Sequence, residues 1–144
     1  MSTPANYKQV LAHFQNAPKD VQSYLPSFEK LVAGYTWDVS ISYVFSRVEA
    51  MKHTTIYCGI VKLHWTDSEL TRRVVDRDHM GRGRFRELFK TVFGKPIAEE
   101  LLAKLSAAES VRDKIAHGKS WTDAQARQAL VDIIDFATGF NEFV

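Results

Sequence analysis

The sequence predicts an all-α protein, a helical bundle of about six helices with one long central helix. Apolar residues recur at spacings of three and four along most of the 144 residues, which is the period of an amphipathic helix. Patterns that alternate apolar and polar residues are scarce, and the chain has only 7 glycines and 4 prolines. Hydrophobic residues make up 45% of the chain, which is enough to form a packed core.

Short helices are expected in the first 34 residues. The first occupies residues 5–16 and ends ahead of Pro18, which suits the first turn of a second helix reaching about Leu25. Pro26 opens a third piece, which Gly34 closes. The apolar residues at helical spacing in the first and third pieces are Tyr7, Val10, Leu11 and Phe14, and Phe28, Leu31 and Val32.

One long helix is predicted from about Trp37 to Trp65. The β-branched and aromatic residues at positions 41–45 would also suit a strand. The length of the periodic pattern and the lack of internal turn signals favour a helix, about 43 Å long at about 1.5 Å per residue. A break in this helix would fall near Thr54 or Gly59. Its apolar residues are Ile41, Val44, Phe45, Val48, Met51, Ile56, Ile60 and Leu63.

Two helices and a loop are predicted next. Asp67 is a favoured N-cap residue for a helix that runs through Val75. A polar loop at 76–83 follows, and residues 84–93 form another helix, which Gly94 ends. The apolar residues of that helix are Phe85, Leu88, Phe89, Val92 and Phe93.

The following helix starts at Pro96, and its first turn carries two glutamates, which the helix dipole favours there. It either runs unbroken to His117 or restarts near Ser106, and Gly118 suits the position after its end. Its apolar residues are Ile97, Leu101, Leu102 and Leu105.

The last helix begins with a capping-box pattern, in which Thr122 is the N-cap residue and Gln125 follows three positions later. Its apolar residues are Leu130, Ile133, Ile134, Ala137 and Phe140. Together these helices predict a single domain over residues 1–144, in which residues 1–34 extend a bundle core formed by residues 36–143.

The composition of the chain excludes several classes of protein and of site. A net charge of +2 excludes a polycation, so any nucleic-acid contact must come from a local patch. The single cysteine, Cys58, excludes an internal disulfide and is expected in the core. The histidines have no metal-binding spacing, so no metal or other cofactor is expected. No apolar run approaches the about 20 residues that cross a bilayer, and we expect a soluble cytoplasmic protein without membrane contact.

Three side chains suited to phosphate chemistry lie near the end of the helix that precedes Gly118. Arg112 offers a planar fork of donors to a phosphate. His117 can move a proton near neutral pH. Asp113 lies four positions before His117 on the same helix face, where its carboxylate can orient the imidazole or tether the arginine.

Arg112 and His117 are five positions apart, about 140° around a helix, so one helix does not bring them together. Fraying at Gly118 would move His117 round, or a second protomer would supply the opposing pair. In such a cleft His117 takes the proton of a ribose 2′-hydroxyl or protonates the leaving oxygen, and Arg112 stabilises charge on the phosphate. The predicted reaction is metal-independent RNA cleavage with a 2′,3′-cyclic phosphate as first product, and DNA should resist it.

A purely structural interpretation of the same stretch stays open. Glu109, Asp113 and Lys114 would then be the solvated face of a helix. A basic residue near a helix C-terminus is stabilising by a few tenths to about 1 kcal/mol through the dipole alone.

The stretch Arg112-Asp113-Lys114-Ile115-Ala116-His117 resembles the signature of the HEPN superfamily, the higher eukaryotes and prokaryotes nucleotide-binding domain. That signature is an arginine, usually followed by a polar residue, and a histidine after four to six intervening residues. The run Ile115–Gly118 is similar to an ending common in the family. The likeness in architecture covers about residues 36–143, with a long early helix and the motif before a final amphipathic helix.

This resemblance implies a homodimeric ribonuclease, a toxin or antiviral effector, in which Arg112 and His117 of both protomers line one cleft. It implies an antitoxin or other partner protein for some members. Other members are non-catalytic and serve as dimerisation or nucleic-acid- or nucleotide-binding modules, which is the alternative. One toxin subgroup has a tyrosine, modified by a partner nucleotidyltransferase, where this chain has Lys119, so that pairing is not expected.

A basic segment at residues 72–90 is the predicted RNA contact. It holds seven basic and three acidic side chains, a local net charge of +4. A solvated loop with basic flanks is the competing interpretation. The residues expected to contact RNA are Arg72, Arg73, Arg77, Arg82, Arg84, Arg86 and Lys119.

The three tryptophans, Trp37, Trp65 and Trp121, lie at the ends of predicted helices. We expect them to anchor packing rather than to stack on bases, because a large aromatic side chain at a helix end usually packs against the core.

Overall fold

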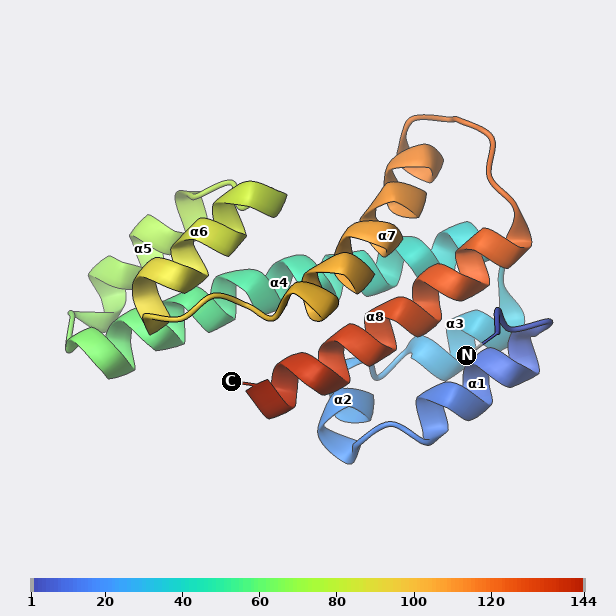
Figure 1. The fold of residues 1–144 in the computed structure, drawn as a ribbon, viewed down its shortest axis with the longest axis horizontal. Helices are drawn as coiled ribbons and strands as arrows, with labels where there is room; N and C mark the ends of the chain where they lie inside the picture. Colours follow the sequence, from blue (N-terminus) through green and yellow to red (C-terminus); the bar gives the residue numbers. More distant parts are fainter. Residues whose placement is uncertain (1, 144) are drawn as a thin grey trace. The chain divides into compact units, whose positions relative to one another are not determined.

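The computed structural model describes residues 2–143, and it is all-α over that range, without a strand (Figure 1). The side chain of Arg82 lies outside the described residues. The helices are α1 (Tyr7–Gln15), α2 (Lys19–Tyr24), α3 (Phe28–Gly34), α4 (Trp37–His64), α5 (Ser68–Arg77), α6 (Arg82–Phe93), α7 (Glu99–Ala116) and α8 (Asp123–Phe143).

The expected number of about six helices is wrong, because the described residues form eight. The short pieces before residue 35 are separate helices: α2 has 6 residues and α3 has 7. Helices this short are marginal on their own, so they are held by packing rather than by intrinsic propensity. Val21 of α2 and Phe28 and Val32 of α3 are buried and provide that packing.

Helix boundaries follow the predicted capping residues closely. Asp67 accepts a hydrogen bond from the backbone N–H of Leu70 at 2.8 Å and so caps α5. Thr122 and Gln125 exchange the two bonds of a capping box, at 3.0 and 3.2 Å. Gly94 ends α6 in the left-handed conformation.

The chain divides into two compact units, which are described separately. Unit 1 consists of residues 1–47 and 99–144, and unit 2 of residues 48–98. The prediction of one domain over residues 1–144 stays a prediction.

Unit 1 is built around α8, which buries eight residues and packs along α7 (Figure 1). Helix α1 packs on α8 and on α3, where the rings of Phe14 and Phe28 stack 4.4 Å apart. Asp135 of α8 ties three helices together, because it pairs with His13 of α1 at 2.6 Å and with Lys104 of α7 at 3.3 Å. Unit 1 therefore holds α7, the helix of the candidate motif, on a packed support.

Unit 2 consists of the second part of α4 with α5 and α6. Helix α4 has no break at Thr54 or Gly59. A Cβ atom at Gly59 would lie 2.7 Å from the Phe93 ring and 2.7 Å from Val92, so glycine lets α6 approach α4 closely. His64 fixes the same contact, with its Nε2 2.9 Å from the carbonyl oxygen of Val92.

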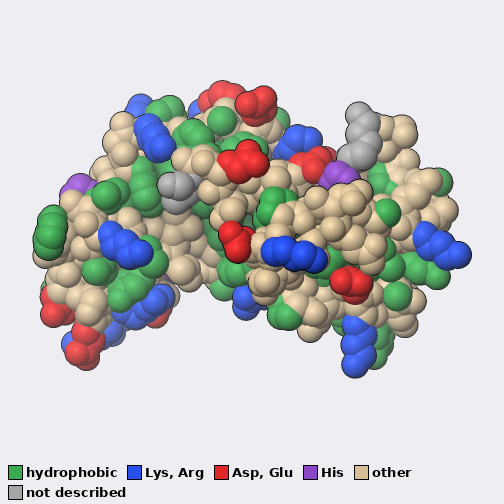
Figure 2. All heavy atoms as spheres, turned by 90° about the horizontal axis from the view of Figure 1, so that it is seen from below, with side chains coloured by type: hydrophobic (Ala, Val, Ile, Leu, Met, Phe, Trp, Pro, Cys, Tyr) green, Lys and Arg blue, Asp and Glu red, His purple; other side chains and the backbone are tan. Residues whose placement is uncertain are grey.

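Each helix within residues 2–143 is too short or too polar to span a bilayer. On the face drawn in Figure 2, basic and acidic side chains are interspersed rather than gathered into large areas of one sign.

Candidate active site

The motif lies at the C-terminal end of α7, and its backbone is fixed by a Schellman motif. Helix α7 runs unbroken to Ala116, so no restart occurs near Ser106. The N–H of Lys119 donates to the carbonyl oxygen of Lys114 at 2.8 Å. Gly118 donates to Ile115 at 3.3 Å, and its φ of 67° is the left-handed conformation that this motif requires.

His117 occupies the C-cap position of α7. Its backbone N–H still donates to the carbonyl oxygen of Asp113 at 3.0 Å, so its main chain remains attached to the last helical turn. Its side chain is exposed. An imidazole on a fixed backbone and open to solvent is accessible to a large substrate.

Arg112 is held by two carboxylates and an aromatic ring. Its Nε donates to Oδ1 of Asp113 at 2.8 Å, and one terminal nitrogen lies 3.7 Å from Oε2 of Glu109. The guanidinium carbon lies 4.9 Å from the centre of the Phe45 ring on α4, within cation–π range. The Arg112 side chain as a whole is 29% exposed, so part of it is open to solvent.

Glu109 is buried, with 2% of its surface exposed. The interpretation that places Glu109 on a solvated helix face is therefore wrong. Helical spacing carried a sign of this, because Glu109 lies four positions after the buried Leu105 and so on the same helix face; its charge alone suggested exposure. Burying a carboxylate is costly unless it is paired, and Arg112 supplies part of that pairing.

Asp113 tethers the arginine, one of the two roles that the sequence allows it. Its carboxylate is engaged by Arg112 rather than by His117 in the described structure. Arg112 packs towards α4, whereas His117 is exposed at the helix end. Their offset of about 140° around the helix predicts that one chain does not bring the arginine and the histidine together.

The predicted RNA contacts divide between the units. Lys119 lies in unit 1 beside His117 and is exposed, and the six arginines lie in unit 2. Arg84 forms a two-pronged contact with Asp78, with distances of 2.9 to 3.3 Å. That pairing raises the pKa of Arg84 above its usual value, through the hydrogen bond and the charge of Asp78.

Arg72, Arg73, Arg77 and Arg86 are exposed. Arg73 pairs with Glu69 at 3.3 Å. Arg72 lies 3.9 Å from Asp76, and its guanidinium carbon is 3.8 Å from the centre of the Tyr57 ring. Such exposed ion pairs contribute little to stability, so the arginines can exchange carboxylates for phosphates at small cost.

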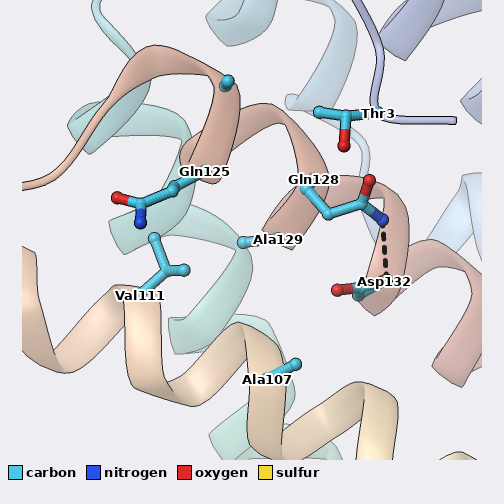
Figure 3. Close-up of a pocket in the computed structure, with 8 residues that line it drawn as sticks. Thr3, Ala107, Val111, Gln125, Gln128, Ala129 and Asp132 are labelled. Carbon is cyan, nitrogen blue, oxygen red and sulfur yellow. Dashed lines mark hydrogen bonds between the residues drawn. The ribbon is translucent and has the colours of Figure 1, made fainter.

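A cavity of about 290 Å³ separates part of α7 from α8 in unit 1 (Figure 3). Gln128 donates to Asp132 at 3.0 Å on one side of it, and Ala107 and Val111 of α7 form the other side (Figure 3). Burial raises the pKa of Asp132, against the opposing effects of the Gln128 hydrogen bond and the charge of Lys104.

Two features escaped the sequence reasoning. Trp65 is 91% exposed, so its predicted role as a packing anchor is wrong. His53 joins α4 to the loop before α6, with Nδ1 2.9 Å from the carbonyl oxygen of Glu49 and Nε2 3.0 Å from that of Asp78.

Among residues 2–143, no group of three or more His, Cys, Asp or Glu side chains is arranged to hold a metal ion.

No protein-family model matches the chain, and neither a curated protein nor a solved structure matches it. The likeness to the HEPN superfamily rests on the residues of the chain itself.

Proposed function

We propose that this protein is a metal-independent endoribonuclease of the HEPN type, with His117 as the acid–base group. The observation that carries the proposal is the end of α7, where an exposed imidazole sits on a fixed C-cap five residues after a tethered arginine. These are the residue types that RNA cleavage by 2′-hydroxyl attack needs, a proton carrier and a phosphate-binding fork.

The roles follow from the contacts. His117 removes the proton of the ribose 2′-hydroxyl or protonates the departing 5′-oxygen. Arg112 binds the scissile phosphate and stabilises the charge that develops on it. Asp113 positions Arg112 through the 2.8 Å bond to Nε. Because the two groups diverge on one helix, the active form pairs two copies of α7 across a two-fold axis.

A second function is favoured by the charges around Arg112. Glu109 and Asp113 offset its positive charge, which lowers its attraction for a phosphate. A non-catalytic module that dimerises, or binds a nucleic acid or nucleotide, is therefore the alternative.

RNA cleavage by the purified chain in EDTA separates the two functions. We expect the wild type to produce 2′,3′-cyclic phosphate ends, and His117→Ala to be slower by about 10²- to 10⁴-fold, the usual contribution of a positioned histidine. His79→Ala is the matched control, because His79 is also exposed but lies in unit 2. Cleavage retained in His117→Ala would remove the catalytic role.

A dimer that cleaves none of a set of structured and unstructured RNAs would support the alternative. The role as toxin or defence effector is tested in cells. Expression of the wild type should arrest growth, and His117→Ala should relieve the arrest. Pull-down of a co-expressed neighbour protein would test for an antitoxin.

A further inference from the structure

Trp65 is placed in a way that packing does not explain. Helix α4 ends at His64, and Trp65 follows it with a φ of 56°. Among the described residues other than glycine, Trp65 is the one with a positive φ. Side chains with a Cβ rarely adopt this conformation, and backbone strain of this kind gathers at functional positions. The indole itself is 91% exposed, although tryptophan is normally highly buried.

The backbone around Trp65 is held by hydrogen bonds to α5. Thr66 and Thr71 share a bond between their hydroxyl oxygens at 2.7 Å. Thr71 also donates to the carbonyl oxygen of Asp67 at 2.7 Å, and Asp67 caps the helix through the N–H of Leu70. The exposed indole therefore stands on an ordered connection at the start of α5.

The outer face of α5 continues from this point with apolar and basic side chains. Leu70 is 59% exposed and Val74 is 62% exposed. Successive residues of a helix are about 100° apart around its axis. Arg73 and Arg77 therefore share with Leu70 and Val74 one sector of the helix surface, about 100° wide. Thr71 and Val75 lie on the opposite side and are buried. Over about 10 Å along the helix axis from Leu70 to Arg77, at about 1.5 Å per residue, two apolar side chains thus lie beside two guanidinium groups.

We infer that Trp65 is a stacking platform for an unpaired base of single-stranded RNA, with Arg73 and Arg77 contacting the adjacent phosphates. Proteins that bind single strands combine an aromatic face for a base with a basic surface for the backbone. The charge of unit 2 favours RNA over a protein partner, since residues 48–98 hold ten basic and six acidic side chains; on α5 and its cap, three arginines are balanced by Asp67, Glu69 and Asp76. This inference rests on the proposed function only in taking RNA as the ligand.

The test measures binding of a single-stranded RNA 12-mer to the full chain carrying His117→Ala, so that cleavage does not interfere. Trp65→Ala should weaken binding by about 5- to 150-fold, the range measured for loss of one stacked base. Trp65→Phe should retain most of the affinity, and Trp65→Leu should bind as weakly as Trp65→Ala. Trp37→Phe is the control, because Trp37 lies in unit 1 and is partly buried.

Tryptophan fluorescence gives an independent readout. RNA should quench the emission of the His117→Ala chain, and adding Trp65→Phe should remove most of that quenching, leaving only what arises at Trp121, while adding Trp37→Phe should leave it. Unchanged affinity in Trp65→Ala would overturn the inference. Full affinity in Trp65→Leu would also overturn it, because an apolar contact, such as one made to a protein partner, would then be sufficient.

The outcomes separate this inference from the proposed function. Trp65-dependent binding of RNA that the wild type does not cleave would support the stacking platform and contradict the nuclease. His117-dependent cleavage with normal RNA binding by Trp65→Ala would support the nuclease and contradict the platform.

Discussion

Removing the guanidinium of Arg112 should destabilise unit 1, because it leaves the buried carboxylate of Glu109 with less positive charge beside it. Two unit charges 3.7 Å apart interact by about 4.5 kcal/mol at an effective dielectric constant of about 20. Arg112 is 29% exposed, so water screens part of this. Breaking a buried pair typically costs about 3–5 kcal/mol, and we therefore expect Arg112→Ala to cost about 3 kcal/mol.

Urea unfolding followed by far-ultraviolet circular dichroism measures this cost. With a slope of about 2 kcal/mol/M, the unfolding midpoint should fall by about 1.5 M. A double-mutant cycle with Glu109→Gln then isolates the pair. In the Glu109→Gln background, where no buried charge remains at position 109, Arg112→Ala should cost only about 1 kcal/mol, mainly for its lost contact with Phe45.

Equal costs of Arg112→Ala in the two backgrounds would refute the reasoning, since the charge of Glu109 would then play no part. The same result bears on function. A loss of activity in Arg112→Ala would have two origins, lost phosphate binding and lost stability. His117 is exposed, so a loss of activity in His117→Ala would have one origin, the lost imidazole.

Three further predictions concern pH and backbone. Burial lowers the pKa of His53, but hydrogen bonds to the backbone of Glu49 and Asp78 and the charge of Asp76 outweigh it, so the pKa is raised. The contribution of protonated His53 to stability is then complete below the pKa that His53 has in the unfolded chain, about 6.5. This contribution is lost as pH rises through the higher pKa that His53 has in the folded chain. The stability lost in His53→Gln should therefore be larger at pH 5.5 than at pH 9 in urea melts, and an equal loss would contradict the assignment. Gly59→Ala should cost about 1–3 kcal/mol through overpacking, measured in the same way; a neutral effect would show that α6 moves freely. Gly118→Ala should cost about 1–2 kcal/mol, because its φ is 67°, and an unchanged melting temperature would argue against the Schellman end of α7.

Sequence periodicity and capping chemistry predict most of the helices of this fold. The long helix is expected at 37–65 and observed at Trp37–His64. Asp67, Thr122 and Gly118 act as predicted, because capping depends on side chains and conformations within a few residues. Where no capping residue marks a helix end, the predicted boundary is less accurate. Helix α7 begins at Glu99 rather than Pro96, and α5 continues to Arg77 instead of ending at Val75.

Features that depend on long-range packing were not predictable. The burial of Glu109 and of Lys52, each almost fully enclosed, runs against the usual exposure of charged residues. The exposure of Trp65 runs against the usual burial of tryptophan. The assignment of Arg112, Asp113 and His117 as site residues stays a prediction from the sequence. The contact of Arg112 with Phe45 required the placement of α4 beside α7.

The single-turnover rate constant for RNA cleavage in EDTA tests the proposed role of His117 most directly. It is compared for wild type and His117→Ala on one oligonucleotide, and for wild type on the same oligonucleotide with a 2′-deoxy sugar at the cleavage site. If His117 and the 2′-hydroxyl carry the reaction, the first change lowers the rate by at least about 10²-fold and the second abolishes cleavage at that site. Equal rates for the wild type and His117→Ala, or cleavage at the deoxy position, would contradict it.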